Sequence, residues 1–131
     1  MRRLLFLAVI GLAGCGGNGD TRDFAYLQGR TSALDASLIQ TIAPVQRLQR
    51  SAEEELLNAV ARDYALCLAA HYALTEGFGF ARLVRTQTTA SKGVWQADAV
   101  YAISDAFPPG NARIDVEVTV ADCRERRIPV L

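Results

Sequence analysis

The longest regular pattern in the chain is a run of helix-forming residues from position 52 to position 76. Ser51 and Glu54 have the spacing of a capping box, in which the two side chains bond to backbone groups at the start of a helix. Gly77 stands where glycine commonly ends a helix. Residues 64–74 include no charged side chain unless His71 is protonated, so this helix is expected to be buried on more than one side. The pattern predicts one long helix over about 52–76.

Beyond position 77 the hydrophobic period changes to two, which is typical of strands with one buried face. Strands are predicted over about 78–88, 94–104 and 112–122, separated by turns that contain glycine or proline. The third strand has the most regular alternation, with apolar residues at Ile114, Val116, Val118 and Val120. The order of elements predicts an α+β fold, in which the long helix packs on a three-stranded antiparallel meander.

The segment before the long helix, residues 31–49, is ambiguous. Its apolar residues recur at three- and four-residue spacing, which favours a shorter N-terminal helix over about 33–43. Pro44 would then kink or end that helix, because proline lacks the N–H group and clashes with the preceding turn. A strand through residues 37–42 is the alternative, and it stays open. The apolar positions are Leu34, Leu38, Ile42, Val45 and Leu48.

The first 15 residues have the layout of an export signal. Arg2 and Arg3 precede an apolar run over residues 4–13, which is too short to span a bilayer. The run closes on Leu12-Ala13-Gly14-Cys15, and this motif resembles the lipobox of bacterial lipoproteins. An ordinary secretory signal in which Cys15 is incidental is the alternative reading.

The resemblance implies that residues 1–14 are removed and that Cys15 is acylated, with the lipid bilayer as its first partner. Several acyl chains anchor a protein far more firmly than one. Residues 15–23 would form a flexible, glycine-rich tether, and residues 24–131 would form a single domain. Gly16 stands where many inner-membrane lipoproteins have Asp. The resemblance therefore implies the cell envelope, at the inner leaflet of the outer membrane and facing the periplasm.

The mature part also resembles small uncharacterised proteobacterial lipoproteins over residues 55–86, a likeness that implies no activity. The charge balance excludes one class of partner. Without residues 1–14, the chain has 12 basic and 14 acidic side chains, for a net charge of about −2. That balance gives no basic footprint for nucleic acid. The chain has no catalytic motif, phosphate-binding glycine loop or histidine cluster, so neither an enzyme nor a cofactor or metal is expected.

Cys67 and Cys123 remain after lipidation of Cys15. An even pair in an oxidising compartment predicts a disulfide, here between the long helix and the region after the third strand. The alternative uses Cys67 with Asp63 and His71, which fall on one helical face, as a metal-binding or thiol-dependent site.

The candidate binding face lies on the predicted sheet and combines charged with aromatic residues. We expect a non-catalytic binding or structural role there, toward an envelope protein partner. A homodimer through the apolar stretch 64–74 is a further possibility. The residues of the candidate face are Arg82, Arg85, Trp95, Asp98 and Tyr101.

Overall fold

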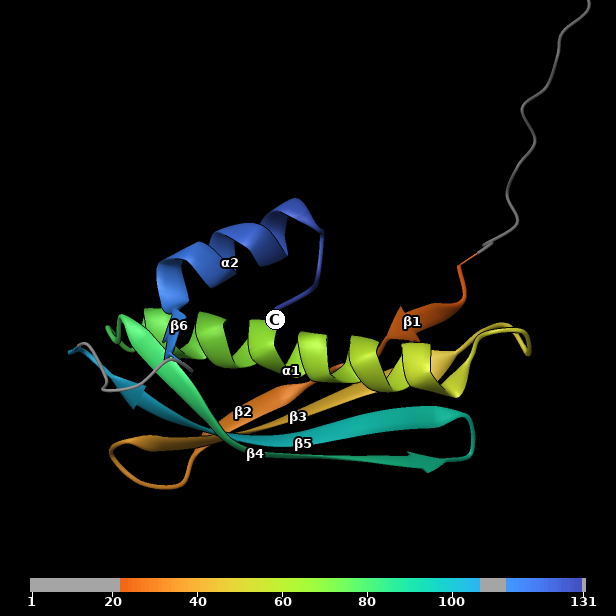
Figure 1. Cartoon of the computed structure of the whole chain (residues 1–131), viewed down its shortest axis with the longest axis horizontal. Helices are drawn as coiled ribbons and strands as arrows, with labels where there is room; N and C mark the ends of the chain where they lie inside the picture. The colour runs from red at the N-terminus through yellow and green to blue at the C-terminus, as the bar shows by residue number, and fades with distance from the viewer. Residues whose placement is uncertain (1–21, 107–112, 131) are drawn as a thin grey trace, which may run out of the picture.

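The computed structural model describes residues 22–106 and 113–130. The export signal, the lipobox with Cys15 and most of the tether lie outside these residues. Six strands and two helices make up the described fold (Figure 1). In chain order they are β1 (Phe24–Tyr26), β2 (Arg30–Ala33), β3 (Leu38–Arg47), α1 (Glu54–Thr75), β4 (Phe80–Ser91), β5 (Val94–Ser104), β6 (Arg113–Asp115) and α2 (Val116–Glu125).

The strands form one antiparallel sheet in the order β1-β3-β5-β4-β6, and β2 also pairs with β3. β1 and β2 share the same edge of β3, because β2 pairs with residues 39–42 and β1 with residues 45–47. Pro44 lies in the interval between these two pairings. Its carbonyl oxygen accepts a hydrogen bond of 3.0 Å from the Leu27 N–H. The missing N–H of proline is thus tolerated at a break in the ladder.

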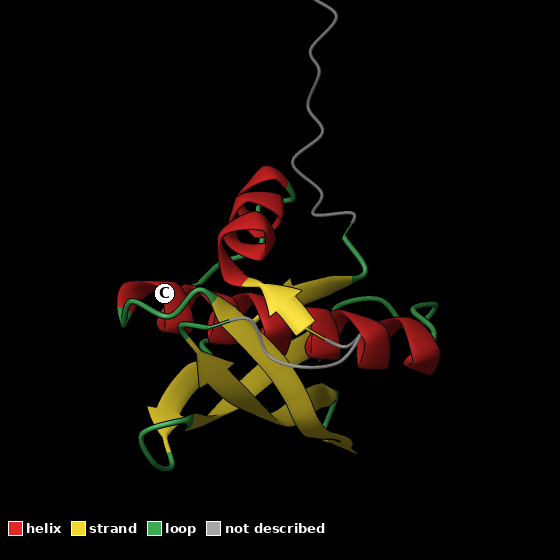
Figure 2. Ribbon diagram, turned by 60° about the vertical axis from the view of Figure 1, so that its left-hand side comes forward, coloured by secondary structure: helices red, strands yellow, loops and turns green. Residues whose placement is uncertain are grey.

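The sheet curls around α1, and α2 lies on the other side of α1 (Figures 1 and 2). We call the sheet face toward α1 the inner face and the opposite one the outer face. Inner-face residues of β3 and β5 are almost fully buried against the helix, as Ile39 and Ala97 illustrate. The helix meets the sheet through small side chains, which let the two backbones approach closely. These are Ala61, Ala65, Ala69 and Ala73.

The end of α1 confirms one prediction, and its start corrects another. Gly77 has φ +86°, its N–H donates to Leu74 O, and the next N–H, of Phe78, donates to Ala73 O. This is the pattern of a glycine-terminated helix. At the other end the helix begins at Glu54, and the preceding residue makes no side-chain cap. The capping box of Ser51 is therefore wrong.

The strand expected over 112–122 is wrong, and with it the three-stranded meander. Only β6 is extended there, and residues 116–125 form α2. The Asp115 carboxylate caps α2 by accepting a hydrogen bond of 3.1 Å from the Val118 N–H. The residues that α2 buries have helical spacing, and Val118, expected to alternate with them, is 66% exposed. They are Val116, Val120 and Cys123.

The helix expected over 33–43 is also wrong, because β3 occupies this segment. Its buried positions have a period of two, which is the strand alternative. Asp35 lies in the turn before β3, where its carboxylate accepts a hydrogen bond of 2.7 Å from the Ser37 N–H. The observed fold is therefore a curled six-stranded sheet with two helices, in place of one helix on a three-stranded meander.

Candidate functional site

A disulfide and an ion pair fasten α2 to α1. Cys67 and Cys123 are bonded, with their Cα atoms 5.9 Å apart, as the sequence predicted. One turn away, the Arg126 guanidinium contacts both carboxylate oxygens of Asp63, at 2.5 and 3.1 Å. Arg126 also bonds to Asp122 on its own helix. Two side chains spaced one turn apart on α1 thus hold the C-terminal helix.

The same helical face contains the residues of the alternative metal or thiol site. Asp63, Cys67 and His71 do share one face of α1, but the first is paired with Arg126 and the second is oxidised. Over residues 22–106 and 113–130, no group of three or more metal-ligating side chains comes together. The disulfide leaves Cys67 without a thiol for a ligand or a nucleophile.

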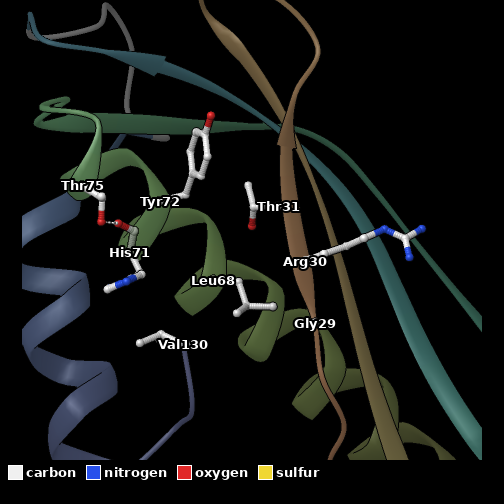
Figure 3. Close-up of a pocket in the computed structure, with 8 residues that line it drawn as sticks. All are labelled: Gly29, Arg30, Thr31, Leu68, His71, Tyr72, Thr75 and Val130. Atoms are coloured by element: carbon white, nitrogen blue, oxygen red, sulfur yellow. Dashed lines mark hydrogen bonds between the residues drawn. The ribbon is translucent and has the colours of Figure 1, made fainter.

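His71 lines a pocket of about 220 Å³ between α1, β2 and the C-terminal segment (Figure 3). Its Nδ1 atom is buried and has no hydrogen-bond partner among the described residues. Arg30, which also borders the pocket, extends its guanidinium away from it, and Val130 lies beside the His71 ring. Among the described residues that line the pocket, none directs a charged group at the histidine.

The charged members of the candidate binding face lie together on the outer face of the sheet. Arg85 and Asp98 form an ion pair of 3.6 Å between β4 and β5. Gln40, on β3, donates a hydrogen bond of 2.9 Å to the same carboxylate. Arg82 is exposed on β4, three residues from Arg85, and the register places both on this face. Gln40 was not expected on this face, because its segment was predicted to be a helix.

The two aromatic members lie on the inner face. Trp95 and Tyr101 are only 7% and 4% exposed and pack under α1. The Arg47 guanidinium lies over the Trp95 ring, 4.7 Å from its centroid. The five candidate residues are thus divided, three on the outer face and two on the inner, and only the charged ones share a surface.

Neither helix covers the outer face in the described part of the chain (Figures 1 and 2). The centre of this face is mixed: Val100, opposite Arg85, is only 5% exposed, Ala102, opposite Arg82, is partly buried, and the polar Gln40 and Asp98 stand beside them. Arg30 is exposed at the far edge, on β2, and its register partner Ile42 stands on the same face. Arginines therefore flank a centre of mixed polar and apolar side chains from two edges of the sheet.

A groove on the inner side runs between α1 and β4, with a volume of about 250 Å³. Tyr101 lines it, and burial and the charge of Asp63 raise the pKa of its phenol to about 12. The sequence placed Tyr101 on the candidate face but gave no sign of this groove, because its walls come from four separate elements. The lining residues are Arg62, Asp63, Leu66, Leu83, Thr86, Tyr101 and Ile114.

A family model for the YNQ4 C-terminal domain matches residues 26–127. The chain belongs to this family. The YNQ4 C-terminal domain match begins at the last residue of β1 and ends just after α2, so it includes both disulfide cysteines and strands β2 to β6. No curated protein and no solved structure matches the chain. Among the helices of the described residues, none is long and apolar enough to cross a membrane.

Proposed function

We propose that the chain is a lipid-anchored, non-catalytic envelope protein whose domain binds a protein partner through the outer face of its sheet. The observation that supports this most is the arginine-flanked outer face, with polar and apolar side chains at its centre, which neither helix covers in the described part of the chain. Protein interfaces combine apolar contacts with a polar, solvent-accessible rim. Arginine is also enriched at interfaces, because its planar group pairs with carboxylates in two-pronged geometry.

Charge on the outer face favours a partner with acidic side chains. Arg82 and Arg30 are both exposed there, whereas Asp98 already pairs with Arg85 and accepts a hydrogen bond from Gln40. The local surplus is positive although the mature chain is expected to be slightly acidic. Complementary charge mainly speeds association and selects the partner, which suits a protein confined near a membrane.

Residues 1–15 support the lipid anchor, which the proposal assigns to the inner leaflet of the outer membrane. β1 begins at Phe24, nine residues after Cys15, so the partner would lie close to that membrane, in the periplasm. An intact mass of protein extracted from membranes tests the anchor: a chain that starts at acylated Cys15 supports it, and an unmodified Cys15 contradicts it.

The binding role is tested by reversing charge on the outer face. We expect Arg82→Glu with Arg85→Glu to abolish co-purification of a cross-linked partner from the envelope while the domain stays folded. Glu117→Arg, on the exposed side of α2, is the matched control and should leave the partner in place. If the double reversal retains the partner, the outer face is not the binding site.

A further inference from the structure

Among the described residues, the edge of the sheet at β4 is open over most of its length. β6 pairs only with Phe80, Ala81 and Arg82. In the described structure no other strand adds beyond them, so residues 83–91 pair on one side alone, with β5. An edge of this kind presents unpaired backbone N–H and C=O groups to any extended chain.

A bulge between Leu83 and Arg85 separates this open edge from the part that β6 covers. Bulges protect edges when they twist them away, but they also re-aim side chains next to binding sites. Here the register with β5 is regular again from Arg85 to Ser91, so a straight segment of seven residues remains available. Val84, the extra residue of the bulge, is exposed, and the side chain of Leu83 is turned toward the groove.

The groove lies beside the start of this open segment, and its walls are mainly apolar. Leu83 faces the inner side of the sheet and is 43% exposed, so it forms an accessible part of the groove wall. Tyr101 lies deeper and is 4% exposed. The groove thus offers a mainly apolar wall beside the start of the open segment.

We propose that β4 pairs along Arg85–Ser91 with an extended segment of an acidic partner protein, which places one apolar side chain in the groove. Strand addition of this type takes affinity from main-chain hydrogen bonds and specificity from pockets for alternate side chains. Side chains alternate along a strand, so the residues next to the groove residue point to the outer side. There they meet Arg85 and Arg82, which match acidic side chains.

This inference rests on the proposed function and specifies how the partner is held. Pairing of this kind favours a partner segment in which acidic and apolar residues alternate. A second copy of this chain fits less well, because β4 itself has threonine and glutamine at most of these positions and arginine at Arg85. Its outward side chains would bring no acidic group to the arginines.

The test uses a labelled nine-residue peptide that alternates glutamate with valine or leucine. Its control has the same composition with the apolar residues in one block. We expect the alternating peptide alone to bind the full chain by fluorescence anisotropy, and to slow amide hydrogen exchange over residues 85–91. Leu83→Glu, which puts negative charge at the groove, should weaken binding about tenfold or more. Val118→Glu, on the exposed side of α2, should change it less than about twofold.

Three results would overturn the inference: equal binding of the two peptides, unchanged exchange over residues 85–91, or unchanged affinity in Leu83→Glu. Exchange that slows with protein concentration alone would assign the edge to a second copy and overturn it as well. If Arg82→Glu with Arg85→Glu abolishes the envelope partner while the alternating peptide fails to bind, the proposed function stands and the strand addition does not.

Discussion

The helix side and the β4 side of this domain are built in opposite ways. On the helix side, α2 is joined to α1 by a disulfide and by the Arg126–Asp63 ion pair, and the side chains between the helices are buried. On the β4 side, no described strand pairs with the backbone edge after Arg82, and the large apolar side chains of Leu83 and Val84 are exposed. Cross-links thus hold the fold on the helix side, and the β4 side is the one that we propose to bind a partner.

The largest expected effect is loss of the disulfide. Cys67→Ala with Cys123→Ala removes a cross-link between residues 56 apart in the sequence. The chain-entropy estimate for such a loop is about 4 kcal/mol of unfolding free energy. Urea unfolding followed by circular dichroism measures it. Val118→Ala is the control, and a loss below about 1 kcal/mol would show that the disulfide is not a main support of the helix side.

The next effect appears at high pH. Burial and the nearby Asp63 charge raise the pKa of Tyr101 from 10.0 to about 12. Since the folded pKa lies above the unfolded one, the neutral phenol stabilises the fold below pH 10, and this contribution is lost as pH rises toward 12. It amounts to about 3 kcal/mol at most. Tyr101→Phe should flatten the fall in stability over that range, and an unchanged fall in the variant would contradict the assignment.

Tyr64 connects α1 to the segment between β1 and β2. Its hydroxyl donates to Leu27 O at 2.8 Å and accepts from the Gly29 N–H at 3.2 Å. Tyr64→Phe leaves both backbone groups without this partner, so we expect a loss of about 2 kcal/mol in thermal or urea unfolding. Tyr72→Phe removes a hydroxyl that has no such bonds and serves as the comparison. Equal losses in the two variants would sink this explanation.

The smallest effect on the helix side comes from the exposed ion pair. Arg126→Ala should cost about 1 kcal/mol or less, because the guanidinium is partly exposed and screened by water. The cost should shrink further in 1 M salt, where charges separated by more than a few ångströms are screened. Arg124→Ala is the control on the same helix. A large, salt-independent loss in Arg126→Ala would mean that its packing, not its charge, holds α2.

Part of this architecture was readable from the sequence, because local signals and tertiary packing agree there. The unbroken run up to Gly77 matches α1 and its glycine end, and the alternation that follows matches β4 and β5. The disulfide followed from two cysteines in an expected oxidising compartment. Each of these features depends on neighbours in the chain or on composition.

The elements that the sequence did not predict correctly depend on tertiary contacts. Residues 114–120 alternate as a strand would, but the same valines fit a helical stripe once Asp115 caps a helix and Cys123 bonds to Cys67. The spacing Val116, Val120, Cys123 was the available signal. In β3, the leucine and isoleucine positions matched a helical period by coincidence. Pro44 is accommodated between the part of β3 that pairs with β2 and the part that pairs with β1. The five residues of the candidate binding face do not share one surface. Two of them stand at alternate positions along their strand and therefore point to the opposite face of the sheet.

Photocrosslinking in cells, at one position on each side, tests the central comparison most directly. A photoreactive residue at Gln87 stands on the outer face, opposite Asp98, and one at Val118 stands on the exposed side of α2. We predict a discrete crosslinked partner from Gln87 that disappears with Arg82→Glu, and none from Val118. A partner captured only from Val118, or from neither position, would contradict the assignment of binding to the β4 side.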